Sequence, residues 1–271
     1  MSPAELGAEA LGVPENRVVS VTLLRDGVTN DSWLVRTASA AVVVRINNPH
    51  AQSLHVDRGV EGEVLRIVAA AGIGPEVLLC DPKRHVLVTR YLGPTCTADD
   101  MHAPERIERL ARLLRKLHAL PGSPSVGPLR WRDVVADYAA TLTTLNPDAA
   151  LLDPDRKSRV LALATQIESA SRPHGLCHND IHHLNLIDAG ELRLLDWEYA
   201  AVGDPYFDLA SAAFYAEFNM EERALLLRAY EGRVDATMLQ HLSKACAVFE
   251  YVHDLWHEVR GLVGARPTDA M

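Results

Sequence analysis

Hydrophobic positions in the first part of the chain follow the patterns of β-strands. β-branched residues are frequent in Arg17–Leu24, Ser32–Thr37 and Ala41–Ile46, and the third of these segments is apolar at all but one position. Val77–Cys80 and His85–Tyr91 have the same character. The pattern therefore predicts five strands before about residue 92.

One helix is predicted between the third and fourth strands. Apolar residues recur there at the spacing of a single helix face, and the glycine-rich run Ala71–Pro75 ends the helix. Beyond about residue 92 the periodic segments are helical almost throughout, beginning with an apolar face over 107–117. Further helices are predicted at about 132–144, 155–170, 205–217, 221–231 and 236–261.

The helical part is interrupted once, over residues 176–196. Short strands are predicted there at Asn185–Asp188 and Leu192–Leu195. This order of elements predicts an α+β protein with a small β-rich N-terminal lobe, residues 1–92, and a larger, mostly helical C-terminal lobe, residues 93–271. A cleft between two such lobes is a common position for a ligand site.

Composition narrows the class of protein. No apolar run approaches the roughly 20 residues that a membrane-spanning helix needs, so no membrane partner is expected. The first residues lack the basic and apolar segments of a signal peptide, and the expected location is the cytoplasm. A formal net charge of −9 argues against nucleic acid as a partner. The four cysteines show no CxxC spacing, which favours free thiols over a zinc site.

The densest group of polar residues lies in the interruption itself. Asp180 and Asn185 stand five residues apart on a loop, and Asp196 follows the strand predicted at 192–195. Phosphoryl transfer needs an acceptor for the proton of the attacking hydroxyl and oxygen ligands for Mg²⁺. The residue types therefore predict Asp180 as the catalytic base, and Asn185 and Asp196 as ligands of the Mg²⁺ that accompanies ATP.

Two other classes of protein stay open on the residues alone. The histidines around Asp180 also suit a metal-dependent hydrolase, although such a site needs further ligands elsewhere in the chain. A catalytically silent pseudokinase is the other alternative. His178 is expected to support the loop through hydrogen bonds from its ring to loop carbonyls, and His182 to face the solvent or the substrate.

The ordered motifs resemble a known family. His178-x-Asp180-x-x-x-x-Asn185, followed by Asp196, is similar to the catalytic and metal-binding motifs of protein-kinase-like enzymes. The sequences CHND, DWEYA and GDPYFDLA resemble the aminoglycoside phosphotransferase and choline kinase group, especially bacterial choline/ethanolamine kinases and thiamine kinases. The resemblance runs from about residue 20 to about residue 260. It implies a protein-kinase-like two-lobe fold and a kinase that transfers the γ-phosphate of ATP to an alcohol.

The same resemblance implies that the N-terminal lobe, residues 1–92, binds the nucleotide. Arg45 stands where ordinary protein kinases have the lysine that holds the α- and β-phosphates, and Glu61 is its expected acidic partner, with Glu63 as the alternative. A charge on a buried strand needs such a partner. The adenine is expected against the backbone at Tyr91 and Leu92.

The loop that would cover the phosphates departs from the usual glycine-rich pattern. It contains one glycine, Gly27, and the side chains of Thr29, Asn30 and Ser32 would contribute with the backbone N–H groups.

Three acidic residues follow the predicted metal ligand. Glu198 is expected to reach Mg²⁺ or to face a cationic substrate. Asp204 precedes a proline and is expected to cap the next helix. In similar enzymes the acid at the position of Asp208 hydrogen-bonds the catalytic loop, which implies structural support here.

The last predicted helix carries a further hint about the substrate. Phe249 and Trp256 share one side of it, and choline kinases have a similar aromatic helix along the amine pocket. The resemblance thus favours a small cationic amino alcohol, choline or ethanolamine. Thiamine also combines a cation with a primary alcohol, and aminoglycosides stay as a further alternative. Packing of the helix in the protein core explains the aromatic stripe equally well.

Overall fold

The computed structural model describes residues 1–24, 30–47, 56–123, 125–169 and 174–264. The chain divides into two compact units. The first comprises Met1–Cys96 and Leu184–Tyr199, and the second comprises Thr97–His183 and Ala200–Met271. Residues 184–199, which the sequence analysis assigned to the C-terminal lobe, therefore belong to the first compact unit.

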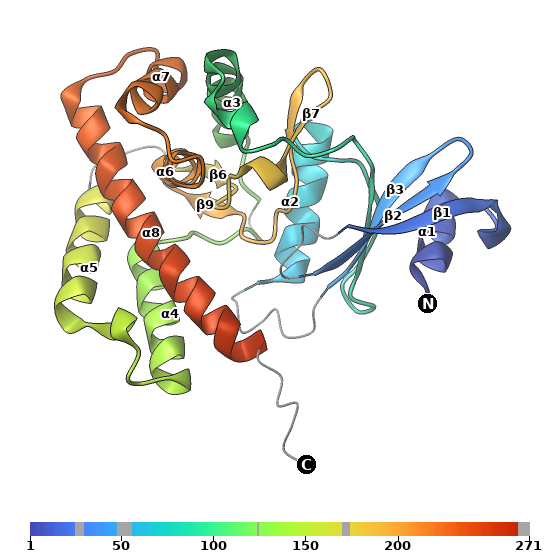
Figure 1. Cartoon of the computed structure of the whole chain (residues 1–271), viewed down its shortest axis with the longest axis horizontal. Coiled ribbons are helices and arrows are strands. Elements are labelled where there is room, and N and C mark those ends of the chain that lie inside the picture. The colour runs from blue at the N-terminus through green and yellow to red at the C-terminus, as the bar shows by residue number, and fades with distance from the viewer. Residues whose placement is uncertain (25–29, 48–55, 124, 170–173, 265–271) are drawn as a thin grey trace. The chain divides into compact units, whose positions relative to one another are not determined.

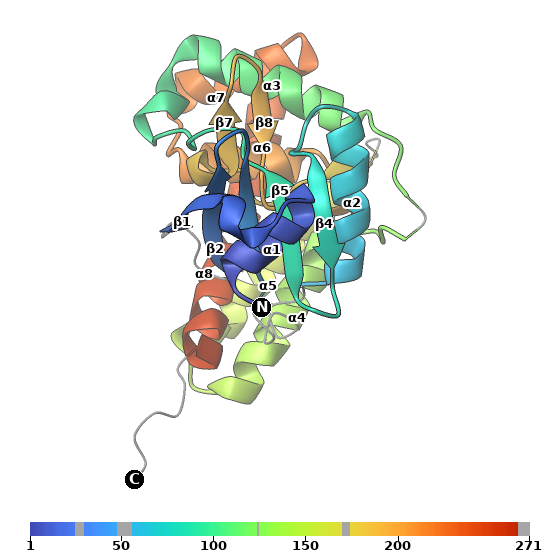
Figure 2. The same ribbon diagram turned by 90° about the vertical axis from the view of Figure 1, so that its right-hand side faces the viewer.

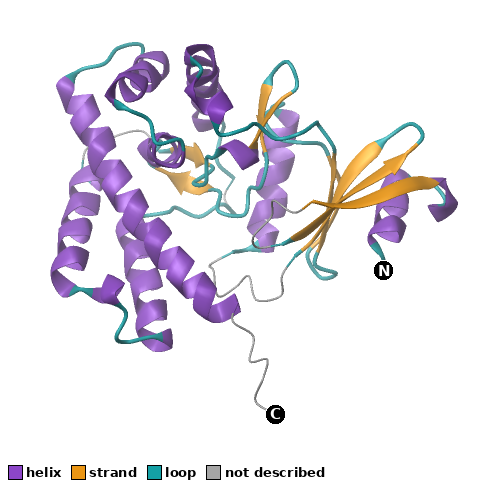
Figure 3. Cartoon of the chain, viewed as in Figure 1, coloured by secondary structure: helices purple, strands orange, loops and turns teal. Residues whose placement is uncertain are grey.

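The first unit is built on a five-stranded antiparallel sheet (Figures 1 and 3). Its strand order is β1-β2-β3-β5-β4, and each strand runs antiparallel to its hydrogen-bonded neighbour. Every strand coincides within a few residues with one predicted from the sequence. The strands are β1 (Val18–Leu24), β2 (Asp31–Thr37), β3 (Ala41–Ile46), β4 (Val77–Asp81) and β5 (Val86–Arg90).

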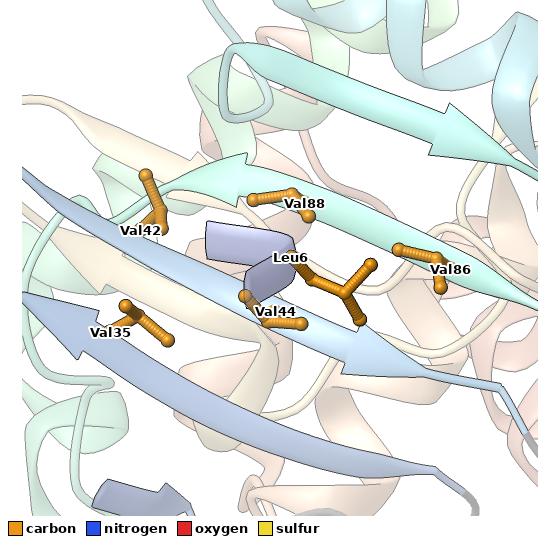
Figure 4. Close-up of a cluster of buried hydrophobic side chains, with 6 residues drawn as sticks. All are labelled: Leu6, Val35, Val42, Val44, Val86 and Val88. Carbon is orange, nitrogen blue, oxygen red and sulfur yellow. The ribbon is translucent and has the colours of Figure 1, made fainter. Parts of the chain in front are cut away.

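Helix α1 (Pro3–Leu11) covers one face of this sheet (Figure 2). Ser2 and Glu5 form a reciprocal capping box at its start, which satisfies two backbone N–H groups that have no partner inside the helix. Leu6 packs on alternate residues of the neighbouring strands (Figure 4), as the twofold periodicity of a strand requires. The strand residues of this core are Val35, Val42, Val44, Val86 and Val88.

The alternation of β3 gives Arg45 the opposite face of the sheet from its neighbour Val44. Helix α2 (Arg58–Ala70) begins at Asp57, whose carboxylate accepts hydrogen bonds from two backbone N–H groups of the first turn. The helix buries Glu61 among its apolar residues. The 3₁₀ turn η1 (Glu15–Arg17) completes the N-terminal part of this unit.

A separate hairpin belongs to the first unit as well. Strands β7 (Leu186–Asp188) and β8 (Leu192–Leu194) pair antiparallel and follow the 3₁₀ turn η5 (His183–Asn185). The N–H of Leu194 donates to the carbonyl of Ile73, and the N–H of Cys96 donates to that of Leu186. These bonds fix the hairpin to the segments that follow α2 and β5.

The second unit is mostly helical (Figures 1 and 3). The long helix α8 runs beside α4, α5 and α6, and α3 lies beside α7 (Figure 1). The short strands β6 (Gly175–Cys177) and β9 (Ala201–Gly203), which the sequence analysis did not predict, pair antiparallel. The helices are α3 (Pro104–His118), α4 (Trp131–Leu145), α5 (Pro154–Glu168), α6 (Tyr206–Tyr215), α7 (Met220–Glu231) and α8 (Ala236–Gly264), and the 3₁₀ turns are η3 (Asp99–His102) and η4 (Ala150–Leu152).

The predicted fold class is confirmed: a β-rich unit and a mostly helical unit are both present. Among the described residues, no helix has the combination of length and apolar character that crossing a lipid bilayer requires.

Candidate active site

The loop after β6 carries Asp180, and Asp208 of α6 holds this loop in place. One Asp208 oxygen accepts the N–H of His178 at 2.9 Å, and the other accepts the N–H of Asn179 at 2.6 Å. Nε2 of His118 lies 2.9 Å from the first of these oxygens. Asn179 has φ of 67°, a conformation that only a well-supported loop retains in a residue other than glycine. Asp208 is fully buried, so these bonds form away from competing water.

Two more residues brace the same loop. Nδ1 of His178 accepts the backbone N–H of Asp180 at 3.2 Å, whereas the bond expected from the sequence was one to loop carbonyls. The hydroxyl of Ser211 accepts the N–H of Ile181 at 2.7 Å. Ser211 and His118 were not singled out in the sequence, because neither belongs to a catalytic motif and both lie far from the loop along the chain.

Asp180 itself lies between His182 and Tyr215. Nε2 of His182 is 3.4 Å from one carboxylate oxygen, and the Tyr215 hydroxyl donates a hydrogen bond to the carboxylate. Burial raises the pKa of Asp180, but the hydrogen bonds and charge around it outweigh burial, and the pKa is held below its ordinary value. From the sequence, His182 was expected to face either the solvent or the substrate, and the structure places it against Asp180.

Asp204 sits at the start of α6, one position earlier than predicted. The helix begins at Tyr206 with Pro205 at the capping position, and the Asp204 carboxylate accepts the N–H of Tyr206 at 2.9 Å. Helix boundaries shift by a residue or two with their definition, so the interaction itself agrees with the expected cap.

The predicted metal ligands occupy the open end of the β7–β8 hairpin, in the first unit. Asn185 directly precedes β7, and Asp196 follows two residues after β8. The N–H of Leu195 donates to the carbonyl of Asn185 at 2.9 Å, so the pairing of the two strands continues to the residues that carry the chemistry. An amide oxygen beside a carboxylate is a hard donor set of the kind that Mg²⁺ prefers, so these residues fit the ion.

Asp196 adopts φ of 57°, again the left-handed region. Its Oδ1 atom lies 2.8 Å from Nη1 of Arg45. Its side chain is 36% exposed, whereas that of Arg45 is 9% exposed, so one side of the carboxylate faces solvent. Asn185 is buried.

Arg45 is fixed by three partners. Its Nη2 atom is 2.5 Å from Glu61, its Nη1 atom contacts Asp196, and its Nε atom donates to Asn47 at 2.8 Å. Burial lowers the pKa of the guanidinium, but the nearby carboxylates raise it further, and the pKa lies above its ordinary value. The sequence left Glu61 and Glu63 open as the partner, and the ion pair in the structure is with Glu61.

A second arginine, Arg58, completes a buried network. Its Nη1 atom lies 2.8 Å from Glu61 and 2.8 Å from Glu198, and its Nη2 atom donates to Asn30 at 2.9 Å. The amide of Asn30 in turn donates to Glu198 at 3.0 Å. Glu61 therefore joins Arg45 to Arg58. Sequence reasoning missed Arg58, although a basic residue one helical turn before Glu61 is a signal that was available.

Glu198 is buried within this network. Burial and the nearby Asp196 carboxylate raise its pKa to about 7, and the two arginines only partly offset them. The sequence expected this side chain to reach Mg²⁺ or to face a cationic substrate. Its observed partners are Arg58 and Asn30.

The other predicted nucleotide contacts are only partly described. Gly27 and Thr29 lie outside the described residues. Ser32 pairs with Arg45 in the register of β2 and β3. The N–H of Tyr91 donates to the carbonyl of Ala41 at 3.1 Å, so that group is already engaged. Leu92 follows at the end of the sheet, partly buried.

The predicted substrate residues on α8 lie in different surroundings. Phe249 is buried against Trp131, Phe214 and Tyr215, and Tyr215 connects it to Asp180. Trp256 packs edge-on against His257, and the guanidinium of Arg260 lies 5.4 Å from the centre of its ring. The face of the Trp256 ring, predicted as a contact for a cationic substrate, therefore already has the side-chain cation of Arg260 over it.

One buried group has the composition of a metal site: His118, Cys177 and Asp208 offer ligand atoms within 4.8 Å of one another. Both Asp208 oxygens accept hydrogen bonds, and Nδ1 of His118 lies 2.8 Å from the Tyr230 hydroxyl. Burial raises the pKa of the Cys177 thiol well above its ordinary value, which disfavours the thiolate that binds metals. Support of the catalytic loop accounts for Asp208 and His118, and the Cys177 thiol donates to the carbonyl of Gly175.

Comparison with known proteins identifies the class. The sequence model of the family described as "Phosphotransferase enzyme family" matches residues 20–241, and the chain belongs to this family. The resemblance and the expectation of a phosphotransferase are thereby confirmed at the level of the family.

Individual relatives are more distant. The Protein LicA of Haemophilus influenzae is 28% identical over 211 residues, which are 75% of this chain and 60% of that protein. Ethanolamine kinase 2 of Rattus norvegicus is 24% identical over 197 residues, 69% of this chain and 51% of that protein. The matched segment is therefore less than two thirds of the length of either relative.

Solved structures agree on the fold. The choline kinase LicA of Streptococcus pneumoniae superposes with a TM-score of 0.81 at 22% identity, over 98% of this chain and 92% of that chain. A choline/ethanolamine kinase family protein of Mesorhizobium loti gives a TM-score of 0.77 at 25% identity, over 99% and 90%. The protein-kinase-like fold that the resemblance implied is thus confirmed.

Proposed function

We propose that the protein is an ATP- and Mg²⁺-dependent kinase that phosphorylates the hydroxyl of a small cationic amino alcohol, with choline or ethanolamine favoured. The observation that carries the proposal is the loop of the second unit that presents the low-pKa carboxylate of Asp180. Asp208, His178 and Ser211 accept hydrogen bonds from the backbone N–H groups of this loop. Such a loop suits phosphoryl transfer, in which positioning supplies most of the catalysis. The proposed location is the cytoplasm, where ATP is available.

Asp180 is the proposed base. Its low pKa keeps the carboxylate ionised at neutral pH, so that it can accept a hydrogen bond from the substrate hydroxyl and orient the oxygen for attack. The proton moves to this carboxylate as the new P–O bond forms and the bond to the leaving ADP breaks. The phosphate passes directly from ATP to the substrate oxygen, without a covalent enzyme intermediate.

Arg45 is the proposed phosphate ligand. Glu61 and Asn47 fix the direction of its guanidinium, which then presents two donors to phosphate oxygens with little loss of side-chain entropy. Asn185 and Asp196 would hold Mg²⁺, which supplies charge neutralisation of the phosphates when bound. Arg58 and Glu198 are assigned no contact with the nucleotide.

The substrate class rests on the names of relatives and on charge. Two relatives are a choline kinase and an ethanolamine kinase by name. The chain carries a formal net charge of −9, which favours a cation over an anion as the second substrate. Tyr215 contacts Asp180 and packs against Phe249, and aromatic rings near the proposed base are the type of group that binds an amine head group.

A coupled assay of ADP release tests the proposal. Choline, ethanolamine, thiamine and a panel of aminoglycosides are compared in the presence of Mg²⁺ and ATP, with Asp180→Asn, Asp196→Asn and Asp155→Asn as variants. Asp155 is an exposed acid of α5 and serves as the matched control. The expected result is alcohol-dependent ADP release that Asp155→Asn retains and that the other two variants lose. Turnover that needs a metal but no ATP, or ADP release unchanged in Asp180→Asn, contradicts the proposal.

A further inference from the structure

Tyr215 occupies the last position of α6 and touches the carboxylate that the proposed function makes the base. We propose that Tyr215 is a positioning residue, whose hydroxyl holds the Asp180 carboxylate in the single orientation that can accept the substrate hydroxyl. The inference rests on the proposed function, since it assigns the orientation of the proposed base. No motif of the sequence points to this tyrosine.

The ring of Tyr215 is held on several sides. It packs edge-on against His182 at 5.0 Å between ring centres, and the same histidine approaches Asp180 to 3.4 Å. Tyr215, His182 and Asp180 therefore form a closed triangle in which each member contacts the other two. The other neighbouring rings are Phe214 at 5.5 Å, Phe249 at 5.7 Å and His253 at 5.5 Å. A ring packed in this way has little freedom to turn its hydroxyl away.

Tyr215 and His182 are donors of different kinds. Burial and the adjacent carboxylate raise the pKa of the Tyr215 hydroxyl above its ordinary value, so it keeps its proton over the whole range in which enzymes work. His182 donates from Nε2 only in the tautomer or charge state that carries a proton there. Tyr215 is therefore the donor that stays constant when the pH changes.

Other ionisable groups also act on Asp180. His178 and His182 share its loop, and His253 and His257 of α8 are close enough to interact with its charge. Burial lowers the pKa of both α8 histidines, which disfavours their charged form. Tyr215 donates to Asp180 and is not a histidine. Removing its hydroxyl therefore changes the hydrogen bonding of the Asp180 carboxylate without substituting any of the histidines.

Tyr215→Phe removes the hydroxyl and leaves the ring. Tyr251→Phe is the matched control, since Tyr251 lies in the same unit and donates its hydroxyl to the carbonyl of Leu151, in a different part of that unit. Loss of a hydrogen bond to a charged group predicts a kcat about 10- to 100-fold lower for Tyr215→Phe, with little change in the KM for ATP. Tyr251→Phe should retain the kcat of the wild type.

The pH profile separates positioning from packing. The Tyr215 hydroxyl lowers the pKa of Asp180, so Tyr215→Phe should move the acid limb of the kcat profile to higher pH. A titration of the aspartate side-chain carboxyl ¹³C resonances, with Asp180→Asn to identify the signal, measures the same shift without turnover. This second readout distinguishes failure of the inference from failure of the proposed kinase activity.

The expected result is a raised Asp180 pKa in Tyr215→Phe and an unchanged one in Tyr251→Phe. An Asp180 pKa that is the same in Tyr215→Phe as in the wild type overturns the inference, whether or not the protein phosphorylates an alcohol. A kcat that falls equally in both variants overturns it as well, because a general packing effect would then explain the loss.

Discussion

The network of Arg45, Arg58, Glu61 and Glu198 makes a strong prediction for Arg58→Met. The substitution keeps most of the side-chain volume but removes the positive charge that lies 2.8 Å from each of two carboxylates. The Glu61 and Glu198 side chains are only 3% and 4% exposed, so water cannot replace the lost donor. We expect the variant to fold with a lower free energy of unfolding.

The magnitude follows from the remaining partners. Each hydrogen bond to a charged group is worth about 1.5–3 kcal/mol, and three are lost, two to carboxylates and one to the amide oxygen of Asn30. Arg45 still binds Glu61 and Asn30 still donates to Glu198, which limits the loss. The buried Nε atom of Arg58 has no hydrogen-bond partner among the described residues, so its removal offsets part of the lost stability. A net loss of about 3 kcal/mol is expected, within the usual range for one broken partner of a buried ion pair.

Urea unfolding at pH 8, without nucleotide or metal, measures this loss. Arg84→Met is the matched control, because Arg84 makes a similar set of bonds to Glu9 and Asp81 in the same unit. There the side chains of Arg84, Glu9 and Asp81 are 36%, 40% and 32% exposed, so water reaches all three. Arg84→Met should change stability little.

A double-mutant cycle of Arg58→Met with Glu198→Gln should show a coupling energy of about 1–3 kcal/mol. Equal losses in the two arginine variants, or a coupling energy of zero, would refute the account of this network.

Three further predictions concern stability. The pKa of Glu198 is raised to about 7 in the folded state, so this carboxyl binds more protons in the folded than in the unfolded protein. As the pH rises from about 4.5 to 7, the free energy of unfolding of the wild type should therefore fall by about 3 kcal/mol relative to that of Glu198→Gln. Parallel curves of stability against pH for the two proteins would contradict this. Asp208→Asn should lose about 2–4 kcal/mol of stability and most of the activity, because a neutral amide cannot accept hydrogen bonds from His178, Asn179 and His118 together. Thermal unfolding measures the loss of stability, and an ADP-release assay measures the loss of activity. Gly175→Ala should destabilise the protein by about 1–3 kcal/mol in urea unfolding, because its Cβ atom would clash with the backbone of His118, whereas Gly261→Ala, with open space around it, should not.

The strands and helices were predictable because their signal is local. Val42–Val44 and the alternation around them define β3 from a few neighbouring residues, and the capping residues of α1 lie within its first turn. The hairpin that carries Asn185 and Asp196 was likewise predictable from two short apolar runs. The strands β6 and β9 were not predicted, because they are as short as β7 and β8 but pair across a long stretch of chain, with no hairpin turn between them to mark the pair.

The residues around the site were less predictable because their partners are distant in sequence. Arg58 meets Glu198 across 140 residues, and His118 meets Asp208 across 90. Glu198 shows the consequence: its spacing from Asp196 suggested a metal or substrate contact, whereas its observed partners come from α2 and from Asn30, just before β2. Tyr215 was missed for the same reason, since only the fold brings the end of α6 to the loop of Asp180.

The central claim is that Asp180 is the base in transfer of phosphate to an alcohol. The most direct measurement is ³¹P NMR of a reaction that contains Mg²⁺, ATP and the alcohol that gives the fastest ADP release, run with the wild type, Asp180→Asn and the exposed-acid control Asp155→Asn. The account predicts a phosphomonoester signal that grows in step with ADP for the wild type and the control, and at least about 100-fold more slowly for Asp180→Asn. Inorganic phosphate in place of the ester, or an ester formed at the wild-type rate by Asp180→Asn, would contradict it.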